Sequence, residues 1–119
     1  MADGTQPGSG TVVVLQAETM GRGDDALGAK LMGSFLRTLT ATSPSPDAIV
    51  LYNAAVKLLA PGSPHLDVLR ALDAAGVDLL ACVTCLEYFA LVEKIAVGQV
   101  SNMREIVQRM TAAAKVISI

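Results

Sequence analysis

The sequence is poor in the residues that mark several common kinds of site. It has no tryptophan, one histidine and two cysteines, and aromatic residues make up 3% of the chain. A tetrahedral zinc site wants four ligands, and His65 is the only soft candidate besides the two cysteines. The sequence therefore disfavours a metal site, and it predicts no cofactor.

Long apolar runs and clusters of one charge are missing as well. Charged residues interrupt every long hydrophobic stretch, so none approaches the roughly 18 uncharged residues of a membrane span. The nine Lys and Arg residues are scattered, and eleven Asp and Glu residues bring the net charge to −2. This distribution gives no electrostatic footprint for nucleic acid. We expect neither membrane nor nucleic-acid binding.

The amino terminus lacks the basic start and hydrophobic stretch of a secretory signal. Residues 1–10 are rich in Gly, Pro, Ser and Gln, which predicts a disordered tail ahead of a single domain over residues 11–119. We therefore expect a cytoplasmic protein. In that reducing setting a pair of cysteines is more often reactive than a structural staple.

What the sequence does hold is aliphatic residues. Hydrophobic residues make up 52% of the 119 positions, and the mean hydropathy is +0.50. This hydrophobic fraction exceeds what the core of a single small domain usually buries, and it predicts a homo-oligomer.

Apolar runs and helix caps alternate along the chain. The runs predict five strands, at Thr11–Gln16, Ala48–Tyr52, Val77–Ala81, Val97–Val100 and Lys115–Ile119. Caps and apolar spacing predict helices that begin at Asp24, Ser63-Pro64, Thr84 and Asn102. The alternation favours an α/β fold, a three-layer α/β/α sandwich around a five-stranded, mostly parallel sheet.

The two cysteines form a C-x-x-C where the third strand meets a helix. Thr84 and Glu87 fit a capping box, which makes Cys85 the first helical residue and leaves Cys82 in the preceding turn, partly open to solvent. A helix amino terminus favours the thiolate, so we expect a lowered thiol pKa and faster alkylation of Cys82 than of Cys85. Sulfur or redox chemistry and a structural role as small hydrophobes both remain open.

Other loops are expected at the same edge of the sheet, because ligands of open α/β sheets bind at the carboxyl ends of the strands. By this rule residues 18–23, Asn53 and Cys82 converge, and Met20, Gly21, Asn53 and Thr84 shape a pocket around the cysteines. The glycines of residues 21–23 lack the rest of a nucleotide-binding fingerprint, and two aspartates follow them. Nucleotide binding is disfavoured.

A family resemblance rests on a series of short motifs in order along residues 11–119. They are Thr19-Met20-Gly21-Arg22-Gly23-Asp24, Leu27-Gly28, Tyr52-Asn53, Val56-Lys57-Leu58, Gly62-Ser63, Gly76-Val77, Cys82-x-Thr84-Cys85-Leu86, Val97-Gly98 and Ser101-Asn102-Met103. This series resembles the DsrE-like domain of YedF-type proteins, described as sulfurtransferase-like and linked to selenium metabolism, within the wider DsrE/DsrF/DsrH and Tus sulfur-relay group.

The resemblance implies a three-layer sandwich with a five-stranded parallel sheet and a persulfide on Cys82, with Cys85 as the second cysteine of the motif. Two positions depart from the pattern: Val83 and Ala90 stand where glycine is common. For Val83 we expect an ordinary extended backbone conformation, which does not need glycine. The TusA-like domain that often precedes such domains is lacking here, so a sulfur donor would be a separate protein.

The leading hypothesis is a small cytoplasmic sulfur-carrier or sulfurtransferase-like protein that holds persulfide sulfur on Cys82 and passes it to an acceptor protein. A TusA-like protein is one candidate partner. Two alternatives are a non-catalytic oligomeric subunit or interaction module of the same fold, and a dithiol redox protein. For the assembly we expect a dimer, trimer or hexamer, of which the resemblance implies the trimer and the hexamer.

Overall fold

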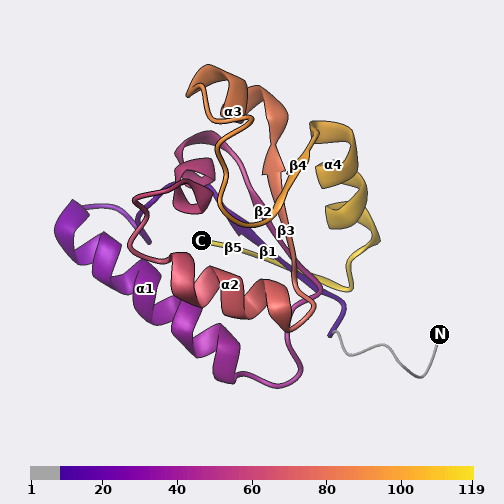
Figure 1. The fold of residues 1–119 in the computed structure, drawn as a ribbon. Coiled ribbons are helices and arrows are strands. Elements are labelled where there is room, and N and C mark those ends of the chain that lie inside the picture. Colours follow the sequence, from indigo (N-terminus) through magenta and orange to yellow (C-terminus); the bar gives the residue numbers. More distant parts are fainter. Residues whose placement is uncertain (1–8) are drawn as a thin grey trace.

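The computed structural model describes residues 9–119, in which five strands alternate with helices (Figure 1). Of the tail expected at residues 1–10, residues 1–8 lie outside the described part. The strands are β1 (Thr11–Leu15), β2 (Ala48–Leu51), β3 (Asp78–Cys82), β4 (Gln99–Ser101) and β5 (Lys115–Ser118). The helices are α1 (Asp25–Ala41), the 3-10 helix η1 (Asn53–Leu59), α2 (Leu66–Ala74), α3 (Val83–Tyr88) and α4 (Met103–Ala112).

The strands form one five-stranded sheet in the order β4-β3-β2-β1-β5, and every pairing is parallel. The three central strands are almost entirely buried, as their unbroken runs of Val, Ile, Leu and Ala require. The predicted α/β fold and the five-stranded parallel sheet are confirmed.

The two faces of the sheet are covered unequally. On one face α1, α2 and η1 pack over the larger core cluster, which includes Leu15, Leu36, Leu51 and Leu69. On the other face α4 contributes Ile106 to a smaller core cluster. In Figure 1 α4 runs alone along that side of the sheet. An ion pair of 3.0 Å between Arg109 Nη1 and Asp78 Oδ2 ties α4 to the start of β3. The molecule thus has the expected three layers, with one outer layer thin.

Two helix starts are where the sequence predicts them. The Asp24 carboxylate accepts a hydrogen bond of 2.8 Å from the Leu27 N–H, and the Asn102 side chain accepts one of 2.9 Å from the Glu105 N–H. These bonds satisfy amide groups that the first helical turn leaves unpaired.

Two other helix starts were predicted wrongly. Helix α2 begins at Leu66 with His65 as its cap residue, not at Pro64, because Ser63 Oγ instead accepts a bond from the His65 N–H in the preceding turn. Helix α3 begins at Val83, and its cap residue is Cys82, not Thr84. Strand β3 extends through Cys82, which pairs with Ser101, so the chain turns directly from strand to helix.

Within residues 9–119, no helix combines the length and the apolar character needed to cross a membrane.

Candidate functional site

The site lies at the point where the connections of two neighbouring strands diverge. After β3 the chain continues to the face of the larger core, where Leu86 of α3 is buried, and after β4 it continues to the opposite face, where Ile106 of α4 is buried. In open parallel sheets such a divergence leaves a crevice at the carboxyl ends of the strands. Cys85 and Met103 line a pocket here, and Cys82 is the residue at which β3 ends.

Cys82 is the last residue of β3, and its side chain belongs to the core beneath α4. Only 1% of the residue is exposed, because the side chain faces the same side of the sheet as Val14, Val50 and Leu80. The expectation that its sulfur is partly open to solvent is therefore wrong. The error comes from the helix start, since a strand that continues through Cys82 places its sulfur inside the sheet packing.

Cys85 is the third residue of α3 and is only partly buried. Its Sγ accepts a hydrogen bond of 3.0 Å from the backbone N–H of Asn53. Burial raises the pKa of the Cys85 thiol, the Asn53 N–H opposes that rise, and the adjacent Cys82 thiol adds to it by hydrogen bonding and by charge. The expected lowering of the thiol pKa is thus wrong for Cys85: α3 has only six residues, and desolvation outweighs its amino terminus.

Asn53 contributes its backbone to the site. It begins the 3-10 helix η1, where the sequence predicted a plain loop, and its φ is +54°. Asparagine tolerates this left-handed conformation better than most residues. The kink aims the Asn53 N–H at Cys85, 32 positions along the chain. Sequence reasoning identified the residue but could not foresee that its main chain makes the contact.

An open pocket of about 450 Å³ lies over Cys85. Most of its lining is apolar or aromatic, and the lining residues are Tyr52, Asn53, Thr84, Cys85, Tyr88, Phe89 and Met103. Of the residues expected to shape it, Asn53 and Thr84 do so, whereas Met20 and Gly21 are not part of the lining. Met20 packs against the larger core, and Gly21 lies in the exposed loop after β1.

A polar pair, missed from the sequence, lies beside Cys82. Ser101 is opposite Cys82 in the β3–β4 register, so the two side chains share a face of the sheet. Ser101 is 4% exposed, and its hydroxyl donates to the Glu105 carboxylate. In a capping box that carboxylate would reach back to the Asn102 N–H. The Glu105 carboxylate therefore accepts from the Ser101 hydroxyl, a partner that the Asn102-x-x-Glu105 pattern does not indicate.

The two departures from the family pattern have different backbones. Val83 does not have a positive φ, as expected, but it is the first residue of α3 and not an extended residue as the sequence predicted. Ala90 has φ +57° in the turn that ends α3, where the Ala90 N–H donates to Glu87 O and the Leu91 N–H donates to Leu86 O at 2.8 Å. This is a Schellman motif, whose left-handed position glycine usually occupies.

No group of three or more His, Cys, Asp and Glu side chains among residues 9–119 is arranged to hold a metal ion.

Comparisons with known proteins agree with this fold. The model of the DsrE/DsrF-like family matches residues 11–119. A search of curated protein sequences finds no match.

Solved structures are similar over nearly the whole chain. The ychN protein from E. coli is 18% identical with a TM-score of 0.67, and the match covers 92% of this chain and 97% of that one. MTH1491 from Methanobacterium thermoautotrophicum, a protein of unknown function, is 24% identical with a TM-score of 0.68 and the same coverage. BT1422 from Bacteroides thetaiotaomicron, also of unknown function, is 17% identical with a TM-score of 0.62, covering 92% of this chain and 94% of that one. These likenesses establish the fold.

Proposed function

The chain belongs to the DsrE/DsrF-like family, and from that membership we propose that it is a small cytoplasmic sulfur carrier. It takes a sulfane sulfur from the persulfide of a donor protein, holds it on the Cys82 and Cys85 pair, and passes it to an acceptor protein. A TusA-like protein is one candidate donor, and selenium is an alternative cargo.

The observation that carries this proposal is the placement of the two thiols. Cys85 lines an open pocket, where the Asn53 N–H points at its sulfur, and Cys82 lies directly behind it in the core. One thiol can meet a partner protein and the other cannot. We therefore assign the entry of sulfur to Cys85 and its storage to Cys82. From the sequence alone, Cys82 was expected to perform both steps.

Entry is a sulfur transfer without net oxidation. The Cys85 thiolate attacks the outer sulfur of the donor persulfide, a bond forms between Cys85 Sγ and that sulfur, and the donor leaves as a thiolate that takes up a proton. The Asn53 N–H, already directed at Cys85 Sγ, supports the negative charge on sulfur before the attack.

Storage repeats the same exchange inside the protein. Cys82 loses its proton and attacks the sulfane sulfur on Cys85, which leaves as a thiolate and is reprotonated. The persulfide then lies in the core beneath α4, away from water and from reductants in solution. Delivery reverses both steps, and the acceptor thiolate receives the sulfur from Cys85.

Oligomerisation is part of the proposal. Apolar side chains are exposed on α3, β4 and α4 around the pocket, where Tyr88 is 83% exposed, and further ones lie on α1 and β5. Exposed aliphatic surface of this kind favours burial against another subunit. We expect a homo-oligomer, and light scattering that gives a monomer across micromolar concentrations would refute this part.

The test is an intact mass after incubation with a persulfide donor, for which a cysteine desulfurase supplied with cysteine serves. We expect the protein to gain the mass of one sulfur atom. Cys85→Ser should not load, whereas Cys82→Ser should load and keep the sulfur on Cys85, as located by peptide mapping after alkylation. A protein that never gains sulfur supports the non-catalytic module instead, and loading of Cys85→Ser overturns the order of the two thiols.

A dithiol redox role is distinguished by the same experiment. A redox protein would lose two hydrogens as Cys82 and Cys85 form a disulfide, with the outer sulfur of the donor persulfide reduced to hydrogen sulfide, and it would gain no sulfur. Burial of Cys82 does not separate the two roles, because a dithiol cycle also uses one thiol that meets the substrate and a second that resolves it. The change in mass decides between them.

A further inference from the structure

The pocket over Cys85 differs from the neighbouring cavities in its charge. None of its seven lining residues is a Lys, Arg, His, Asp or Glu. Two other cavities of similar volume in the described structure include such residues: about 520 Å³ lined in part by Glu18 and Lys57, and about 460 Å³ lined in part by Glu18, Asp25 and His65. The thiol thus lies in the least polar of these three cavities.

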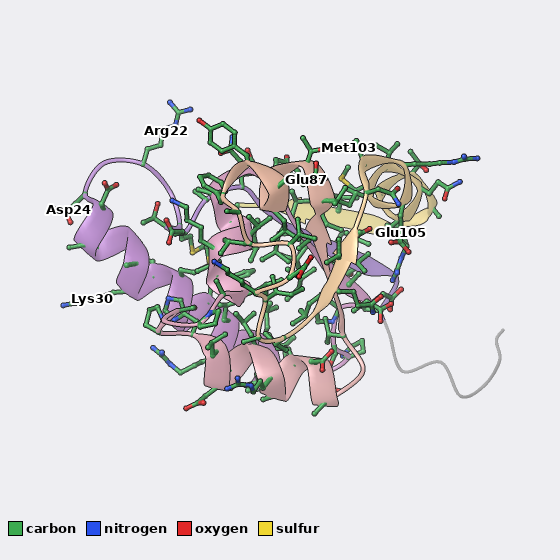
Figure 2. The ribbon with its side chains drawn as sticks, turned by 45° about the horizontal axis from the view of Figure 1, so that its top comes forward. Arg22, Asp24, Lys30, Glu87, Met103 and Glu105 are labelled. Carbon is green, nitrogen blue, oxygen red and sulfur yellow. The ribbon has the colours of Figure 1, made fainter. Side chains whose placement is uncertain are left out.

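The main-chain donor at the thiol and the cations nearest to it are already occupied or directed elsewhere. The Asn53 N–H donates to Cys85 Sγ at 3.0 Å. The Lys57 ammonium lies 4.3 Å from the centre of the Phe89 ring and lines the neighbouring cavity. Arg104 follows Met103 on α4 but projects about 100° further around the helix. In Figure 2 the labelled cations Arg22 and Lys30 lie on the α1 side, across the molecule from Met103.

A charged group that enters such a pocket loses its hydration and gains no counter-charge, which is costly. An uncharged, apolar group instead buries its surface against Tyr52, Tyr88, Phe89 and Met103, and this burial is favourable. The desolvation cost of a charged group and the burial gain of an apolar group both favour a sulfur donor without charge.

We propose that the pocket over Cys85 accepts sulfur from a persulfide borne on an uncharged, apolar group, such as a protein side chain within an apolar segment, and discriminates against anionic small-molecule donors. The proposal rests on the proposed function and names its substrate class. Met103 and Tyr88 at the rim set this selectivity, since both are exposed and both line the pocket.

The test measures the first thiol exchange with two aromatic disulfides of similar size, the neutral 4,4′-dithiodipyridine and the dianionic 5,5′-dithiobis(2-nitrobenzoate). In each case Cys85 thiolate attacks one sulfur of the reagent, a mixed disulfide forms, and the other half of the reagent leaves. The nitrobenzoate leaves as a coloured thiolate, and the pyridinethiolate takes up a proton and is followed as 4-thiopyridone by its ultraviolet absorbance. Each rate is divided by the rate for the same protein unfolded in urea, which removes the intrinsic reactivity of the reagent. Peptide mapping assigns the product to Cys85, and a Cys82→Ser variant isolates the first step.

We expect the corrected rates to favour the neutral reagent by about tenfold or more, since the dianion must shed its hydration in the pocket. Met103→Lys places a cation at the rim and should reduce the preference severalfold, mainly by a faster reaction with the dianion. Val107→Lys is the matched control, because Val107 lies one turn along α4, is exposed to a similar extent (43% against 49%), and does not line the pocket.

Equal corrected rates in the wild-type protein overturn the proposal. An equal effect of the two lysine substitutions also overturns it, because the added positive charge would then act on the dianion without regard to the pocket. These outcomes are separate from failure of the proposed function. A protein that never gains sulfur from a persulfide donor but keeps the preference among disulfides retains the pocket inference and loses the carrier role.

Discussion

The end of β3 and the first turn of α3 are consecutive in sequence but offer opposite environments to a thiol. At the strand end, Cys82 is enclosed between the sheet and α4, beside the Ser101 hydroxyl. In the helical turn, Cys85 reaches an open pocket and receives the Asn53 N–H. A central strand is covered on both faces, whereas a surface helix leaves one side free. Three residues of chain thus separate a buried thiol from an accessible one.

The largest effect expected from this difference is on alkylation. We predict that iodoacetamide modifies Cys85 at least about 100-fold faster than Cys82 in the folded protein, because Cys82 reacts only when the packing under α4 opens. Mass spectrometry of the two cysteine peptides over time measures both rates. In denaturant the rates should converge, and comparable rates in the native protein would show that the strand end is not closed.

A second prediction concerns the pH dependence of Cys85. Its pKa is raised, so the thiolate forms at higher pH than in a free cysteine, and the alkylation rate should keep rising beyond about pH 8.5. Replacing Cys82 by alanine removes a group that raises this pKa, so the midpoint should move down. It should still remain above the usual value, because burial is the larger cause. A midpoint below that of an unfolded control would show that the helix start dominates instead.

The polar pair beside Cys82 gives a third test of the buried region. Ser101→Ala removes the hydroxyl that donates to Glu105, and we expect it to lower the free energy of unfolding by about 1 to 3 kcal/mol. Chemical denaturation measures the loss. The control is Thr84→Ala at the pocket, where the side chain is exposed and is not the cap residue of α3, so the change should be much smaller. Equal losses of unfolding free energy in the two variants would show that the buried region beside Cys82 does not differ from the pocket in this respect.

The sequence predicts the scaffold well because its signals are repeated. Five apolar runs alternate with helical spacing, and each strand lies within a residue or two of its predicted bounds. The caps Asp24 and Asn102 are correct because a carboxylate or amide oxygen directly before an amphipathic run has few other local partners.

The site is harder to predict because its decisive contacts are not local. Thr84 and Glu87 fit a capping box, yet Cys82 is held in β3 by its pairing with Ser101, and this long-range pairing fixes where α3 begins. The hydrogen bond to Cys85 comes from the main chain of Asn53, which no side-chain pattern reveals. The misplaced helix start alone reverses which of the two thiols is expected to be open.

The smallest expected effects compare the two ends of α3, where the family pattern has glycine and this chain does not. Val83 lies in the regular helix start, so Val83→Gly adds freedom to the unfolded chain and relieves nothing. We expect it to lower the free energy of unfolding by about 0.5 to 1 kcal/mol.

Ala90→Gly should act in the opposite direction. At φ +57° the alanine side chain costs about 1 to 2 kcal/mol, which exceeds the entropy that glycine restores to the unfolded chain. We therefore expect Ala90→Gly to stabilise the protein by about 0.5 to 1 kcal/mol, through the Schellman turn that ends α3. Denaturation midpoints of the two glycine variants, measured side by side, should move apart. A shift of both in the same direction would mean that the two ends of the helix do not differ in strain, and that glycine at either position acts only through the unfolded chain.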